Sequence, residues 1–171
     1  MNTSKPEPSE YHPYYSTYIK AMGDVPLLPA LEEGLKDMQS FMASLEDHKL
    51  TFAYDTGKWT VAEVLVHLLD AERIFQYRAL RFARNDRSEL PGFEQDDYVV
   101  ESFANQRTKA EILEEFMGIR QASISLFKSF NEDSLQRMGT ASGVKMSVRA
   151  LGYVICGHQA HHLKVLEDYY F

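Results

Sequence analysis

Apolar residues recur at helical spacing in four stretches of the chain. Between residues 27 and 48 they lie alternately four and three positions apart, and similar stripes run through 60–85, 108–130 and 148–169. Positions at these spacings fall on one face of an α-helix, because the helix makes one turn in about 3.6 residues. No stretch shows a convincing strand alternation. The pattern therefore predicts four amphipathic helices and no sheet.

Short polar signals mark where three of these helices begin. Thr60 is followed three positions later by Glu63, and Thr108 is followed in the same way by Glu111. This is the spacing of a capping box, in which each side chain accepts a hydrogen bond from a backbone N–H that the helix leaves unpaired. Ser147 is a favourable cap for the last helix. These signals agree with the boundaries that the apolar stripes indicate.

The connection between the second and third predicted helices is long. It covers residues 85–107, and the chain breaks within it at Leu90-Pro91-Gly92. Gly139 and Gly143 bracket a loop before the last helix. We therefore predict an all-α fold, a four-helix bundle with a long connection between helices 2 and 3.

Length and composition predict one domain. The chain has 171 residues, of which 44% are hydrophobic, enough to bury one substantial core. Residues 1–10 are polar and contain two prolines, so we expect a flexible tail at 1–10 and a single bundle domain at 11–171. The aromatic cluster that follows is expected to pack on the body of the protein or on a partner subunit; it comprises Tyr11, Tyr14, Tyr15 and Tyr18.

Charge and cysteine content limit which binding partners and which cellular location we expect for this protein. Acidic residues outnumber lysine and arginine by 25 to 18, a net charge of −7 that argues against nucleic acid or an anionic membrane as a partner. The single cysteine, Cys156, cannot form an internal disulfide. Neither a signal-peptide core nor a run of about 20 apolar residues is present. We expect a cytoplasmic protein.

Three of the six histidines fall within residues 158–162. His158 and His162 are four positions apart, so on a helix their imidazoles lie one above the other and can bind one ion. Apolar residues on the same face place both side chains inside the bundle, where unpaired imidazoles are costly. This favours a metal site over hydrogen-bonded core histidines. His161 is rotated by about 100° from His162 and is the weaker ligand candidate.

A third ligand must come from another helix, and His67 lies in an apolar stretch of the second one. Glu63 and Asp70 each lie about one turn from His67 and are candidates to orient its imidazole from the second shell, as is His161 for the fourth-helix pair. For Glu63, helix capping is the favoured role. A divalent transition metal would complete the site, with Zn²⁺ or Ni²⁺ the best fits.

Arginines form a second feature of the second helix. Arg78 and Arg81 fall on the same face as His67, but roughly 16 and 21 Å further along the axis, too far to touch the metal. Ion pairing between helices, with favourable placement near a helix C-terminus, is the favoured interpretation. An anion-binding rim is the alternative.

Several short motifs occur in a fixed order along the chain. They are GKWT (57–60), HLLDAER (67–73), YRALRFAR (77–84), LPGF (90–93) and GHQAHH (157–162). Together they resemble the DinB/YfiT-like superfamily of bacterial four-helix bundles, over most of residues 11–170. The resemblance implies a metal triad of one histidine on the second helix and an HxxxH pair on the fourth, here His67, His158 and His162.

The resemblance leaves three functions open. The first is a transferase of low-molecular-weight thiols, in which the metal lowers the pKa of a cofactor thiol. The second is a metal-dependent hydrolase, with water activated by the ion and a carboxylate moving the proton. The third is a non-catalytic metal-binding stress protein whose ion only ties two helices together. We expect a small-molecule substrate for either enzyme, and a homodimer, because relatives commonly pair and the aromatic segment has apolar surface to cover.

Overall fold

The computed structural model describes residues 4–171 and contains the four predicted long helices. They are α2 (Leu27–Ser44), α3 (Val61–Ala83), α5 (Lys109–Lys128) and α7 (Val148–Tyr170). Each begins within one residue of the predicted start. The largest difference is the end of α2, which lies four residues before the predicted one because the chain continues into a short 3₁₀ helix, η3 (Asp47–Lys49).

The predicted caps are confirmed. The Thr60 hydroxyl accepts from the Glu63 amide at 3.2 Å, and the Glu63 carboxylate accepts from the Thr60 amide at 2.7 Å. Thr108 and Glu111 repeat the arrangement at the start of α5. Ser147 accepts from a backbone amide of the first turn of α7. Local sequence therefore sets the starts of three of the four long helices.

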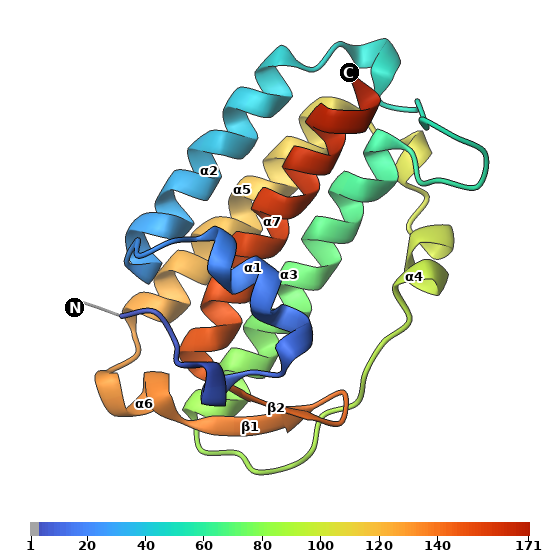
Figure 1. Cartoon of the computed structure of the whole chain (residues 1–171). Helices are drawn as coiled ribbons and strands as arrows, with labels where there is room; N and C mark the ends of the chain where they lie inside the picture. Colours follow the sequence, from blue (N-terminus) through green and yellow to red (C-terminus); the bar gives the residue numbers. More distant parts are fainter. Residues whose placement is uncertain (1–3) are drawn as a thin grey trace.

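The four long helices form a bundle in which each helix packs against one parallel and one antiparallel neighbour (Figure 1). α2 and α7 run one way, while α3 and α5 run the other way. α7 packs against α2 and α3, and α5 packs against the same two helices from the opposite side. The connection from α3 to α5 therefore has to return along the bundle, which explains the predicted length of this connection, and it carries a short helix, α4 (Gln95–Glu101).

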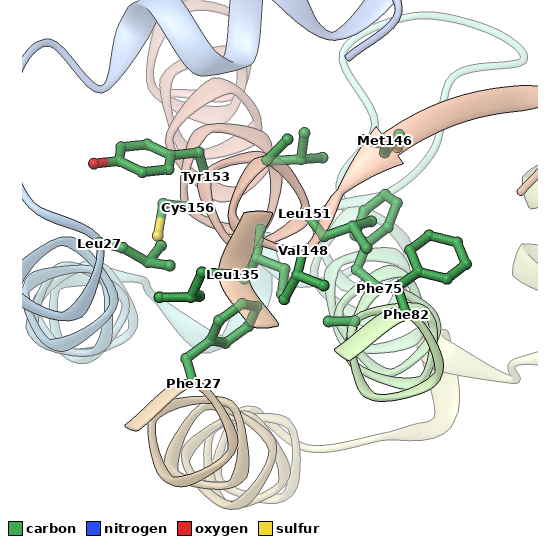
Figure 2. Close-up of a cluster of buried hydrophobic side chains, with 14 of the residues drawn as sticks. Leu27, Phe75, Phe82, Phe127, Leu135, Met146, Val148, Leu151, Tyr153 and Cys156 are labelled. Carbon is green, nitrogen blue, oxygen red and sulfur yellow. The ribbon is translucent and has the colours of Figure 1, made fainter. Parts of the chain in front are cut away.

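Two apolar clusters fill the bundle, one toward each end. In the first, Phe82 of α3, Phe127 of α5 and Leu151 of α7 converge (Figure 2). The second lies toward the end of the bundle where α3 begins, and Leu65 and Phe116 belong to it. No helix within residues 4–171 has both the length and the apolar character that crossing a membrane requires.

Between the two clusters, three of the long helices contribute buried or half-buried polar side chains. We call this set the polar layer: His67 and Glu72 of α3, Arg120 and Ser123 of α5, and His158, Gln159 and His162 of α7. Polar groups inside a core need partners, because an unpaired one forfeits its hydration. The polar layer is therefore where a functional site is to be sought.

The prediction of no strand was wrong for one short segment. The loop predicted between Gly139 and Gly143 is part of an antiparallel hairpin of β1 (Met138–Ala141) and β2 (Val144–Ser147). Ser142 and Gly143 make the turn with positive φ angles of 53° and 73°, the geometry that two-residue hairpins prefer. Strands of four residues are too short for an alternating pattern to stand out.

The N-terminal segment lies across the bundle. Within the predicted tail, Pro8–Glu10 form a 3₁₀ helix, and the Glu10 carboxylate forms an ion pair with Arg149 of α7; residues 1–3 lie outside the described residues. A second 3₁₀ helix, Pro13–Tyr15, and α1 (Ser16–Ala21) follow, and α1 packs on α7. The aromatic cluster thus packs on the body of the protein, one of its two expected positions.

Candidate metal centre

Three imidazoles meet in the polar layer. Nε2 of His158 lies 3.1 Å from Nε2 of His67 and 3.0 Å from Nε2 of His162. One ring nitrogen from each histidine lies within 4.8 Å of the other two, and His161 is not a member of this group. The structure therefore brings together the three residues that sequence reasoning had selected, from α3 and from successive turns of α7.

Hydrogen bonding between the rings does not account for this geometry. A neutral imidazole nitrogen either donates or accepts, so Nε2 of His158 cannot donate to one neighbour and accept from the other. An ion at the centre of the group removes this conflict, because it takes a lone pair from every nitrogen. Zinc–nitrogen bonds of about 2.0–2.1 Å in a tetrahedral site separate the nitrogens by roughly 3.3 Å, close to the spacings found here. The donor set fits a divalent transition metal.

Burial keeps these histidines neutral. Desolvation is the main cause that lowers the pKa of His67 to about 4 and that of His162 to about 3. The pKa of His158 is also lowered, first by burial and then by the neighbouring histidines. Neutral imidazoles keep the lone pair that a metal needs, so the site is ready to bind an ion at neutral pH.

The triad lies at one wall of a cavity of about 370 Å³. Tyr14, Tyr15 and Tyr18 line it from the N-terminal segment, and Phe93 to Asp96 line it from the connection between α3 and α5. This volume falls within the usual range for small-molecule sites. A metal held by the triad would therefore be reachable by a small ligand.

A glycine next to His158 positions the aromatic wall of this cavity. A Cβ atom on Gly157 would lie 2.1 Å from the backbone oxygen of Tyr18, so only glycine permits α1 to approach α7 this closely. The Tyr18 ring then lies edge-on to the rings of His158 and His161, with centroids 5.4 Å apart in both cases. The aromatic cluster and the histidine motif thus form one structural unit.

Glu63 and Asp70, which were candidates to orient the imidazole of His67, make contacts with other residues. Glu63 accepts from the Thr60 amide and from Asn105 at 2.9 Å, so it caps α3 as favoured. Asp70 lies 3.9 Å from Arg73 in an ion pair. Among the described residues, neither carboxylate has a hydrogen bond to a histidine. His161 is exposed and packs on Tyr18 and His162, which places it beside the triad.

Two carboxylates near the triad were missed by sequence reasoning. Glu94 and Asp96 line the cavity, and the charge of Asp96 acts on His67: it raises the His67 pKa slightly, against the larger lowering that burial causes. Both belong to the long connection, and no local pattern indicates where such a segment lies relative to a helix. Gly92 and Phe93, just before Glu94, belong to the LPGF motif, but this motif does not indicate that the segment lies beside His67.

Comparisons with known proteins agree with this picture. A family model described as the DinB superfamily matches residues 30–166. A protein of Oceanobacillus iheyensis, named "Putative metal-dependent hydrolase", is 26% identical over 144 residues, which cover 78% of this chain and 81% of that one. A protein of the same name from Geobacillus thermodenitrificans is 26% identical over 137 residues, covering 79% and 77%.

A solved structure shows the same fold. YfiT from Bacillus subtilis, described as "a probable metal-dependent hydrolase with an unusual four-helix bundle topology", superposes with a TM-score of 0.74 at 15% identity. The match covers 97% of this chain and 91% of YfiT. The family model alone spans well over half of the chain. The protein therefore belongs to the DinB superfamily.

Proposed function

We propose that this protein is a metal-dependent hydrolase whose divalent ion is held by His67, His158 and His162. One observation carries the proposal: three neutral imidazole nitrogens converge at the wall of a cavity large enough for a small substrate. Three neutral ligands leave the full charge of the ion uncompensated and leave a position for a further ligand, which is typical of catalytic rather than structural sites.

When bound, the ion supplies Lewis-acid chemistry, polarising a substrate carbonyl and making water easier to deprotonate. The protein supplies the remaining functions. Phe75, Tyr15 and Tyr18 give the cavity an aromatic wall against which an apolar part of a substrate can pack. Asp96 lines the same cavity and lies within electrostatic reach of His67, and we propose that it accepts the proton of the attacking water.

Hydrolysis is preferred over thiol transfer because of the relatives. Thiol transfer and hydrolysis would need the same three ligands, but the two relatives and YfiT are all described as hydrolases. A non-catalytic role fits less well, because a purely structural ion is normally enclosed by four protein ligands. Among the described residues, the cluster contains three.

The experiment compares two reactions in one preparation. The protein is loaded with Zn²⁺ or Ni²⁺ and assayed for ester and amide hydrolysis without thiol, and for conjugation of an electrophile with a low-molecular-weight thiol, each with and without chelator. We expect chelator-sensitive hydrolysis that Asp96→Asn reduces by about 10²-fold or more, as for loss of a general base. Conjugation that requires both thiol and metal, without hydrolysis, would contradict the proposal in favour of the transferase.

A further inference from the structure

Arg78 is a buried arginine that lacks a carboxylate partner. Three charged residues are buried among those described, namely Glu72, Arg78 and Arg120. Glu72 and Arg120 form an ion pair with each other, with Nε of Arg120 2.8 Å from the carboxylate. No carboxylate within residues 4–171 lies within ion-pair distance of Arg78, although its side chain is only 3% exposed. Its charge is therefore uncompensated inside the protein.

The groups that hold Arg78 are neutral. Nη2 donates to the carbonyl oxygen of Pro91 at 3.1 Å and to the hydroxyl of Ser142 at 2.8 Å. The hydroxyl of Tyr15 adjoins the guanidinium as well. These contacts fix the orientation of the side chain and occupy only part of its five N–H donors. The remaining donors are available to a ligand.

Arg78 and the histidine triad line the same cavity. The ring of Phe75 is close to both: its centroid is 6.2 Å from that of His158 and 5.9 Å from Cζ of Arg78. The helical rise along α3 predicted that Arg78 is too far from His67 to touch the metal, and an anion-binding rim was the alternative to ion pairing. Arg78 is too far from the triad to touch an ion bound there. A small substrate is nevertheless long enough to reach from the triad past the Phe75 ring to Arg78.

The charges of the cavity select the ligand. Arg78 is the one cation among its lining residues, while Glu94 and Asp96 contribute two carboxylates. A single guanidinium matches a singly charged carboxylate, with which it forms paired hydrogen bonds, whereas a phosphate dianion would face the two acidic groups as well. We propose that Arg78 binds a carboxylate group of the substrate while the reacting bond lies at the metal.

This inference rests on the proposed function, since it places one end of the substrate at the ion. It also assigns a role to the hairpin that sequence reasoning missed. Ser142 occupies the tip of that hairpin with a left-handed backbone, and Leu90 pairs with the hairpin through hydrogen bonds of 3.0 Å to Thr140 and from Ser142. The two segments bring the Ser142 hydroxyl and the Pro91 carbonyl to the same guanidinium.

The test uses probes with a metal-binding thiol at one end. The protein is loaded with Co²⁺, its cobalt content is measured, and the thiolate-to-cobalt absorption is followed during titration with 3-mercaptopropionate, 4-mercaptobutyrate and the two matching mercapto-alcohols. We expect the better-fitting acid to bind about tenfold or more tightly than its alcohol, as for a charge-assisted hydrogen bond. Arg78→Gln should abolish this preference and leave the alcohol affinity unchanged.

Two controls separate the possible results. Arg81→Gln removes an arginine on the same helix that pairs with Asp86, and it should keep the preference. Arg78→Lys keeps the charge and should retain part of it. Equal binding of acid and alcohol by the wild-type protein, measurable even if Arg78→Gln fails to fold, would overturn the carboxylate subsite while leaving the metal centre intact. A wild-type preparation that retains no cobalt would instead contradict the proposed function, and with it this inference.

Discussion

The polar layer contains two clusters, and they differ in how completely their polar groups are paired within the protein. Around Arg120, Nε and Nη2 donate to the two oxygens of Glu72 at 2.8 Å, the Ser123 hydroxyl donates to the same carboxylate at 2.6 Å, and Nη1 donates to the carbonyl oxygen of Leu31 at 3.3 Å. Every charge there has an opposite charge beside it. In the histidine triad, three nitrogens face one another with no group between them.

The difference separates a structural cluster from a binding site. Glu72 and Arg120 have compatible shapes and charges, so their network is complete without a ligand. The triad is complete only when something supplies a positive charge to three lone pairs. Arg78 differs from Arg120 in a similar way: both arginines are buried, but Arg78 has no carboxylate partner among the described residues, so it could bind an anionic ligand. Incomplete pairing in a buried position therefore points to ligand contacts in this protein.

The largest effect is expected from breaking the complete cluster. Glu72→Ala leaves the Arg120 charge buried and unpaired, so we expect the free energy of unfolding to fall by about 3–5 kcal/mol in urea denaturation. Glu115→Ala is the matched control, since this carboxylate pairs with Arg73 and Arg107 at a partly exposed position. It should cost about 1 kcal/mol or less. Similar costs for both variants would contradict the structural role of the buried pair.

The metal-free triad should make stability depend on pH. Burial lowers the pKa of His67 to about 4 and that of His162 to about 3. Between these values and pH 6.5, the two histidines are therefore protonated in the unfolded chain but neutral in the folded one. Stability is then full above the unfolded value near pH 6.5 and is lost as pH falls from there toward the folded values, by up to about 1.4 kcal/mol per pH unit for each histidine. Urea denaturation of metal-free protein between pH 7 and 5 measures this slope.

The variant His162→Gln provides the comparison, because it removes one of the titrating groups. Its slope between pH 7 and 5 should be shallower than that of the wild-type protein. An unchanged slope would show that the buried histidines do not govern the pH dependence.

A smaller effect is expected at the contact between α1 and the triad. Gly157→Ala places a methyl group against the Tyr18 backbone, and overpacking of this kind costs about 1–3 kcal/mol. Gly118→Ala serves as control, because a Cβ there meets nothing within 4 Å and should stabilise α5 by about 0.5–1 kcal/mol. In thermal denaturation we therefore expect a lower melting temperature for Gly157→Ala and a higher one for Gly118→Ala than for the wild-type protein. If Gly157→Ala is also stabilising, α1 does not pack on α7 as described.

Sequence patterns predicted the features that depend on local spacing. The four long helices, their caps and the alignment of His158 with His162 all follow from the repeat of one helix. The choice of His67 rested on the family resemblance, and the structure places it within hydrogen-bonding distance of His158. The homodimer and the cytoplasmic location stay predictions.

The features that were missed depend on contacts between distant segments. Arg120 and Glu72 are 48 residues apart in sequence and meet because α5 packs on α3. Asp96 enters the cavity only because the long connection returns along the bundle. That Arg78 shares a cavity with the triad could not be predicted either, because distance along one helix does not describe a cavity that runs beside it. Such features need the packed structure.

Metal stoichiometry in two neighbouring variants tests the central claim most directly. Wild-type protein, His162→Ala and His161→Ala are purified in parallel, incubated with one equivalent of Zn²⁺, desalted at neutral pH and analysed for bound metal. We predict close to one ion per chain for the wild-type protein and for His161→Ala, whose side chain lies outside the triad, and none for His162→Ala. Equal and complete loss in both variants, or full retention in both, would contradict the assignment of the metal centre.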